Sequence, residues 1–231
     1  VCSSDLKVKC VDDTVVSGYF ARPKGAKEKS LGAMGWYDGA GVRTASLGRA
    51  VRGAKLGLIC FMINAHGIEN GKSKEYYDEI ANGRLKEYRH MGKEDKETFY
   101  FLGMYLRVIR SIDFLCAQKE WDGKVVIARG ASQGGAQALA AGGLDNRVTL
   151  VCAGIPAFCN LTGQVPGWPP AFVTKDAKGN QDTKIALTSR YYDGVVMAGR
   201  IKVPAYVTVG FIDNVCAPTS VYCAYNNIKT Q

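Results

Sequence analysis

One serine in the sequence has the neighbours that a catalytic nucleophile needs. The run Gly130-Ala131-Ser132-Gln133-Gly134 matches G-x-S-x-G, the pattern of a serine in a sharp turn between a strand and a helix. An apolar strand is predicted to end at Arg129, and the segment 133–141 (QGGAQALAA) has the composition of a helix. Such a turn excludes bulky flanking residues and exposes the serine Oγ near the helix N-terminus. We therefore expect Ser132 to act as a nucleophile rather than to lie in an inert Gly/Ser loop.

An acidic residue downstream has the position that a partner of this serine would have. Asp213 follows the apolar run 205–210 (AYVTVG), about eighty residues after Ser132. In the α/β-hydrolase fold the triad follows the chain order serine, acid, histidine, with the serine at a strand-to-helix turn. An aspartate that only caps the end of a strand is the alternative. The upstream G-x-S-x-G motif favours the interpretation of Asp213 as the triad acid.

The order of predicted elements fits the same fold. Apolar runs of strand length alternate with segments of helical periodicity, as in a mostly parallel sheet with helices on both faces. The strands are predicted at 56–64, 124–128, 148–153 and 205–210, and a crossover helix at 99–115. We therefore predict one α/β-hydrolase domain over residues 1–231, C-terminally incomplete because its last strand, helix and triad histidine are missing.

Two segments stand apart from this pattern. Residues 1–6 (VCSSDL) resemble a translated sequencing adapter more than a strand or a cap, so we treat them as non-native and exclude them from the fold prediction. The segment 160–192 is rich in Pro, Gly and charge, and it contains Trp168 beside two prolines. Long loops in compact domains tend to be functional. We expect this one to cover the site, with Trp168 in the pocket, or to form an oligomer contact.

Composition argues against several kinds of partner. The formal charge is +9, but basic residues alternate with acidic ones, as over 86–95, which is typical of a solvated face. We therefore expect no nucleic-acid partner, and the absence of a long apolar run predicts no membrane partner. The eight cysteines contain no C-x-x-C pair, and Cys60, Cys116 and Cys152 lie in apolar runs. Small buried hydrophobes are the preferred interpretation, with no metal and no organic cofactor.

The residues from about Pro23 onward resemble the acetyl xylan esterases and cephalosporin-C deacetylases of carbohydrate esterase family seven. The resemblance is strongest over 122–138 and 191–226, which contain Ser-Gln-Gly-Gly at 132–135, Tyr-Asp-Gly-Val at 192–195 and the acid turn at 213–216. It implies that Ser132 is the nucleophile and Asp213 the acid. Small acetyl esters of xylo-oligosaccharides or cephalosporins are the implied substrates, and a homo-oligomer is the implied assembly.

The oxyanion hole is expected from two backbone N–H groups. The residue after the nucleophile, Gln133, supplies one of them. The loop after the third strand supplies the other, and Asp38-Gly39-Ala40-Gly41 occupies that place, which nominates Ala40. The family usually has His-Gly where this chain has Asp38-Gly39, and the preceding run 32–37 (GAMGWY) makes a poor strand. A backbone donor does not depend on the side chain at these positions.

The base of the triad has no obvious candidate among the two histidines of the chain. The resemblance places the catalytic histidine beyond Gln231. His66 follows a predicted strand, so it is expected to border the pocket or to stabilise a loop, but it precedes Ser132 against the usual chain order. His90 lies in a charged stretch, where a solvated side chain is expected.

These residues together predict acyl transfer through a serine ester intermediate. The expected activity is that of a serine carboxylesterase that removes acetyl groups from acetylated xylan, xylo-oligosaccharides and related small esters. The alternatives are another hydrolase of this fold, such as a dienelactone hydrolase or a serine peptidase, and a hydrolase-like binding module without activity.

Overall fold

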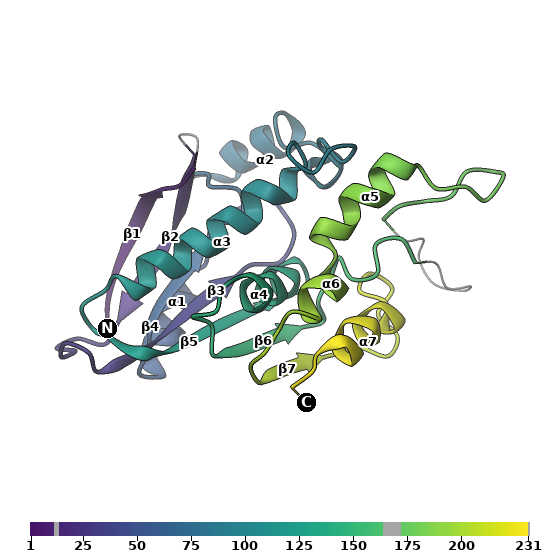
Figure 1. Cartoon of the computed structure of the whole chain (residues 1–231). Helices are drawn as coiled ribbons and strands as arrows, with labels where there is room; N and C mark the ends of the chain where they lie inside the picture. Colours follow the sequence, from purple (N-terminus) through teal and green to yellow (C-terminus); the bar gives the residue numbers. More distant parts are fainter. Residues whose placement is uncertain (12–13, 164–171, 231) are drawn as a thin grey trace.

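The computed structural model describes residues 1–11, 14–163 and 172–230. One sheet of seven strands, in the order β1-β2-β4-β3-β5-β6-β7, runs through the molecule (Figure 1). The strands are β1 Cys2–Lys9, β2 Val15–Arg22, β3 Leu31–Tyr37, β4 Ile59–Ile63, β5 Trp121–Ala131, β6 Leu150–Gly154 and β7 Ala205–Thr208. β1 and β2 are antiparallel to their neighbours, whereas β3 to β7 pair in parallel.

Helices connect the parallel strands and cover both faces of the sheet. They are α1 Leu47–Lys55, α2 Lys74–Asn82, α3 Tyr100–Cys116, α4 Gln133–Leu144, α5 Thr183–Tyr192, α6 Gly194–Ala198 and α7 Pro218–Asn227, and a 3-10 turn, η1, lies at Tyr88–His90. Figure 1 places α3 and α4 on one face and α1 on the other. The predicted α/β-hydrolase fold, a mostly parallel sheet between helices, is therefore confirmed.

β3 shows how the two faces are packed. Successive side chains of a strand point to opposite sides. Accordingly Ala33 and Tyr37 join the large core under α3 and α4, whereas Met34 and Trp36 join the smaller core under α1. The prediction that 32–37 is a poor strand was wrong. The run lies between β4 and β5 and pairs with both. Glycine is favoured at position 35, because a Cβ there would lie 2.5 Å from the Tyr37 hydroxyl.

The N-terminal segment also differs from the prediction. Residues 1–6 were left out of the fold, yet Cys2–Lys9 forms the edge strand β1 and pairs with β2 over its whole length. Most of its side chains are exposed, and Leu6 and Val8 pack against the core. The strand is therefore held mainly by its backbone bonds to β2, which a search for apolar periodicity does not detect.

The remaining predicted elements lie close to their expected places. The strands predicted at 124–128, 148–153 and 205–210 correspond to β5, β6 and β7, and the helix at 99–115 corresponds to α3. The strand predicted at 56–64 is shorter, because Leu56 ends α1 and Gly57 turns the chain with a φ of 83°. Among the described residues, no helix has the length and apolar character needed to cross a bilayer.

All eight cysteines lie in the described part of the chain, and each is a free thiol. Cys60 is buried as predicted, whereas Cys116 and Cys152 are only partly buried. The sequence did not single out Cys159 and Cys216, which are also buried. Burial raises the pKa of the Cys60 thiol to about 12.

Candidate active site

Ser132 lies in the sharp turn that the sequence predicts. It follows β5 and is the residue immediately before α4, with a φ of 56° and a ψ of −122°. A positive φ is unfavourable for any residue with a Cβ and is typical of strained functional positions. Two backbone bonds hold the serine there: its N–H donates to Gly154 O at 2.9 Å, and its carbonyl accepts from Ala157 N at 3.0 Å. Both partners belong to β6 and the loop that follows it.

The glycines of the motif are required by close backbone contacts. A Cβ at Gly130 would lie 2.1 Å from Gly134 O, and a Cβ at Gly134 would lie 2.2 Å from Tyr37 O. Backbone atoms cannot move aside as a flexible side chain can. The glycines of the G-x-S-x-G motif are therefore required because the turn packs directly against the end of β3.

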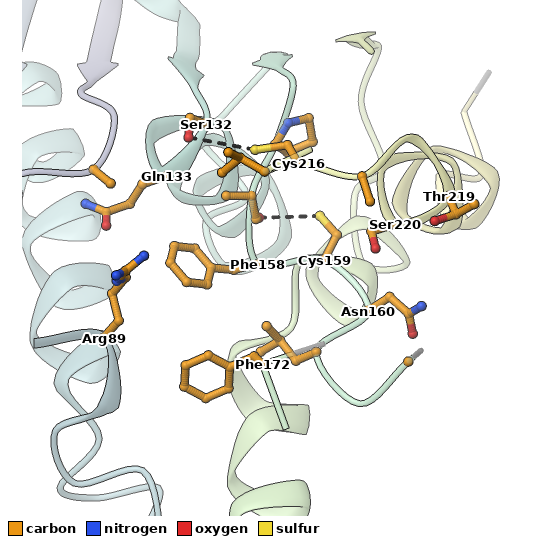
Figure 2. A pocket seen from close by; sticks show the side chains of 17 residues that line it. Arg89, Ser132, Gln133, Phe158, Cys159, Asn160, Phe172, Cys216, Thr219 and Ser220 are labelled. Atoms are coloured by element: carbon orange, nitrogen blue, oxygen red, sulfur yellow. Dashed lines mark hydrogen bonds between the residues drawn. The ribbon is translucent and has the colours of Figure 1, made fainter. Parts of the chain in front are cut away.

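Ser132 opens onto a cavity of about 250 Å³ (Figure 2). Its wall comes from the loop after β6, with Phe158, Cys159, Asn160 and Leu161, and from Phe172. The loop after β7 and the start of α7 form another side, with Val215, Cys216, Thr219 and Ser220. Arg89 is the one charged side chain among the described lining residues. The cavity thus combines an aromatic wall with small polar groups.

The two residues predicted to supply the oxyanion hole, Gln133 and Ala40, both line this cavity. Gln133 N begins α4 beside the serine, and Ala40 lines the same cavity. Among the described residues, neither N–H is bonded to another acceptor. The Gln133 side chain is buried and is bonded elsewhere, since its Oε1 accepts from the Tyr88 hydroxyl at 2.6 Å. Ala40 follows β3 and Gln133 begins α4, and their role in an oxyanion hole stays a prediction.

His66 supports the loop that carries Ala40. Its Nε2 lies 3.2 Å from Gly41 O, and its Nδ1 lies 2.7 Å from the Tyr100 hydroxyl. Burial lowers the pKa of His66 to about 4, so the ring is neutral at pH 7. A carbonyl only accepts, so Nε2 must carry the hydrogen and Nδ1 must accept from Tyr100. Of the two roles expected for His66, the geometry fits loop support, and the residue is not among those lining the cavity.

Asp38, at the position where the resemblance implies a histidine, is bonded within this loop. Its carboxylate accepts from the N–H of Gly39 at 2.9 Å and forms an ion pair with Arg49. Arg43 lies 3.5 Å from the other carboxylate oxygen. The negative charge is therefore balanced by two arginines from the loop and from α1, and the aspartate anchors the turn that presents Ala40.

Asp213 lies in the turn after β7, which carries Cys216 to the serine. Its Oδ1 accepts from Val215 N and Cys216 N, both at 2.8 Å. Among the described residues, no hydrogen-bond donor contacts the other carboxylate oxygen. The same turn brings Cys216 Sγ to 3.8 Å from Ser132 Oγ, as Figure 2 shows. Oδ1 thus fixes the carboxylate, while Oδ2 remains available to a further donor.

Neither histidine lies where a triad base is needed. His66 is bonded at both ring nitrogens behind the Ala40 loop. His90 is largely exposed and stacks on Phe172, with ring centroids 4.9 Å apart and an angle of 4° between the planes. Neither is among the described residues that line the cavity. Trp168, the other expected pocket residue, lies outside the described residues.

The sequence reasoning missed two residues of this region. Cys216 was seen only as part of the acid turn, and Asp193 only as part of the Tyr-Asp-Gly-Val run. The Asp193 carboxylate is buried and accepts N–H groups from the cavity wall, 32 and 33 residues away in the chain. In the sequence, only the place of Asp193 in the Tyr-Asp-Gly-Val run, which resembles the family, pointed to this residue. Among the described residues, no three His, Cys, Asp or Glu side chains form a group that could hold a metal ion.

Comparison with known proteins identifies the family to which this chain belongs. The acetyl xylan esterase (AXE1) family model matches residues 1–231. The acetyl esterase Axe7A of Xylanibacter ruminicola is 34% identical over 227 residues, which cover 96% of this chain and 51% of that protein. The chain thus spans about half the length of this curated relative.

Solved structures agree. The acetyl xylan esterase from Paenibacillus sp. R4 is similar with a TM-score of 0.82 and 25% identity, over 98% of this chain and 74% of that chain. Acetyl xylan esterase 1 from Thermoanaerobacterium sp. JW/SL YS485 gives a TM-score of 0.69 and 20% identity over the same shares, which shows the fold. The match over all 231 residues decides the assignment: the chain belongs to the acetyl xylan esterase family.

Proposed function

We propose that the protein is a serine carboxylesterase that removes acetyl groups from acetylated xylan, xylo-oligosaccharides and related small esters. The observation that carries this proposal is the position of Ser132. It projects from a strained turn into a cavity that two uncommitted N–H groups, of Gln133 and Ala40, also line. Family membership supports acetyl as the acyl group, and the 34% identity to an acetyl esterase supports it further.

The chemistry follows from these positions. Ser132 Oγ attacks the ester carbonyl carbon while its proton passes to a histidine base. The negative charge on the carbonyl oxygen is stabilised by the two N–H groups. The bond to the sugar oxygen then breaks, and the histidine returns the proton to that oxygen. Water attacks the acetyl-enzyme in the same way, releasing acetate and restoring the serine hydroxyl.

Asp213 serves the base in this scheme. With Oδ1 held by Val215 N and Cys216 N, Oδ2 accepts the N–H of the imidazole and keeps it in the tautomer that can take the serine proton. The base itself is a histidine other than His66 and His90, because both of these are placed elsewhere. The resemblance of the acid turn to the family supports a histidine that follows it in the chain.

The cavity favours a small acyl group and a polar leaving group. Its volume of about 250 Å³ suits a short acyl chain together with part of a sugar ring. Phe158 and Phe172 offer apolar faces, and Asn160, Thr219 and Ser220 offer hydrogen-bonding groups. The family resemblance further supports a homo-oligomer, which light scattering on the purified protein would measure.

The test is made on the full-length protein. Hydrolysis of p-nitrophenyl acetate and release of acetate from acetylated xylan are measured for the wild type and for Ser132→Ala. Loss of at least a thousandfold in kcat is expected, because the bond-forming oxygen is removed. Ser189→Ala is the matched control, since this buried serine of α5 only donates to Ala186 O and should leave turnover unchanged.

Labelling distinguishes the remaining alternatives. An organophosphonate should react with Ser132 in an active esterase, and mass spectrometry would locate the adduct. A protein that binds acetylated xylan but neither reacts with the phosphonate nor hydrolyses the ester would be a binding module, contrary to the proposal. Cleavage of a peptide substrate in preference to p-nitrophenyl acetate would instead identify a peptidase.

A further inference from the structure

One buried carboxylate near the cavity has no part in the acyl transfer. Asp193 lies between α5 and α6 with 8% of its surface exposed. Its Oδ1 accepts from Asn160 N and Val195 N, both at 2.8 Å, and its Oδ2 accepts from Leu161 N at 2.7 Å. One carboxylate therefore joins the start of α6 to two consecutive residues of a distant loop.

That loop forms the wall of the Ser132 cavity. Phe158, Cys159, Asn160 and Leu161 all line it, and Figure 2 shows the first three side chains together at the cavity. Phe158 has a φ of 55° and Asn160 a φ of 58°, conformations that residues with a Cβ rarely adopt. Strained backbone persists only where surrounding contacts hold it. The wall consequently needs an external support.

The next residue adds to this support. Gly194 N donates to Phe158 O at 2.8 Å, and a Cβ at Gly194 would lie 2.6 Å from Cys159 Sγ. Only glycine allows α6 to approach the wall so closely. The Asp-Gly pair of the Tyr-Asp-Gly-Val run is thus explained by contacts with the wall and not by helix formation alone.

The charge of Asp193 is balanced by these backbone groups. Burial raises its pKa above the ordinary value, while the N–H bonds from Val195, Leu161 and Asn160 oppose that rise. Among the described residues, no lysine or arginine forms an ion pair with it. A buried carboxylate bound only by N–H groups favours one arrangement of the backbone that supplies them.

We propose that Asp193 is a positioning residue that holds residues 158–161 in the strained conformation lining the Ser132 cavity, and thereby determines how well the acetylated substrate binds. The inference rests on the proposed esterase function for its kinetic consequence. It assigns the residue to substrate binding and not to bond breaking, because no atom of Asp193 lines the cavity.

The variant Asp193→Ser separates this role from capping of α6. Serine is itself a good N-cap and can still accept from Val195 N, but its single oxygen cannot also accept from Asn160 N and Leu161 N. The matched control is Asp182→Ser, which makes the same change at the N-cap of α5. Asp182 accepts from Lys184 N at 2.9 Å and Ile185 N at 3.0 Å and contacts no residue of the wall.

Two measurements are made on the full-length protein. For Asp193→Ser, the KM for p-nitrophenyl acetate should rise about tenfold while kcat changes by less than about threefold, the signature of lost binding. Hydrogen exchange of the Asn160 and Leu161 amides should become at least about tenfold faster. Asp182→Ser should leave KM, kcat and the exchange of these two amides as in the wild type.

Three results would overturn the proposal. Unchanged exchange at Asn160 and Leu161 would mean that Asp193 only caps α6. Faster exchange with an unchanged KM would mean that the wall does not control substrate binding. An equal rise of KM in both variants would indicate a general loss of stability. Should Asp193→Ser fail to fold, Asp193→Asn keeps the volume and one acceptor oxygen, and the same two measurements then decide.

The failure of the proposed function would be seen separately. A wild-type protein without esterase activity refutes that function, whereas the exchange comparison still reports whether Asp193 holds the wall.

Discussion

Lowering the pH should destabilise the folded protein through His66. The ring is buried, and its two nitrogens bond to Gly41 O and the Tyr100 hydroxyl in the neutral form. A protonated ring would present an N–H to Tyr100 and an unsolvated charge to the core. We therefore expect the folded state to resist protonation of His66 while the unfolded chain accepts it.

The size of the effect follows from the two pKa values. The folded pKa is about 4, against an ordinary value of 6.5 for the unfolded chain. The unfolded state binds more protons between these values, so stability is complete above about pH 6.5 and falls as the pH falls towards 4. The full difference corresponds to roughly 3 kcal/mol. For a domain of this size that is a decrease in Tm of roughly 6–12 °C.

The assay compares unfolding of three proteins, followed by circular dichroism, between about pH 7 and pH 4. His66→Gln cannot titrate in this range, so its stability should fall less than that of the wild type by about 3 kcal/mol. His90→Gln is the control: burial lowers the pKa of His90 as well, but its ring is exposed, so its removal should reduce the pH dependence much less than removal of His66. Parallel loss of stability in the wild type and His66→Gln would refute the assignment of a neutral, buried His66.

Three further predictions concern the site and its frame. Asp213→Asn in the full-length protein should fold and bind ester but lose on the order of ten-thousandfold in kcat, through misorientation of the imidazole; a loss below tenfold in steady-state assays would place the acid elsewhere. Gly134→Ala should destabilise the protein by more than about 3 kcal/mol, since its Cβ would lie 2.2 Å from Tyr37 O, and a wild-type Tm would contradict this. His90→Gln should leave the rate of p-nitrophenyl acetate hydrolysis within about tenfold of the wild type, because the exposed His90 ring does not line the cavity; a loss of a thousandfold or more in steady-state assays would make His90 the base.

The sharp turn at Ser132 could be predicted because its constraints are local. The requirement for glycine at 130 and 134 arises from atoms within the turn and at the end of β3, so it leaves a short motif in the sequence. The turn at Asp213 could be predicted for a similar reason: it follows an apolar strand, and the Asp213 carboxylate closes it by accepting from Val215 N and Cys216 N.

The missed features depend on residues far apart in the chain. β3 is a strand because β4 and β5 pair with it on both sides, and its glycine-rich sequence gives no sign of those partners. Asp193 acquires its contacts only when α6 packs against the loop after β6, 33 residues upstream. Periodicity within a segment cannot report either contact. The resemblance to the family draws attention to the pair Asp193-Gly194, but the contacts that require this pair are seen only in the structure.

The free thiols can report local opening of the sheet. Cys2 is exposed on the edge strand β1, whereas Cys60 lies within β4, three strands into the sheet, with no exposed surface. Because burial raises the pKa of Cys60 to about 12, its reactive thiolate forms near neutral pH only when the strand opens to water. Alkylation followed over time would modify Cys2 at once and Cys60 only as fast as the centre of the sheet opens. The order in which the cysteines are labelled would then show, without any introduced reporter, how unfolding proceeds from the edge of the sheet to its interior.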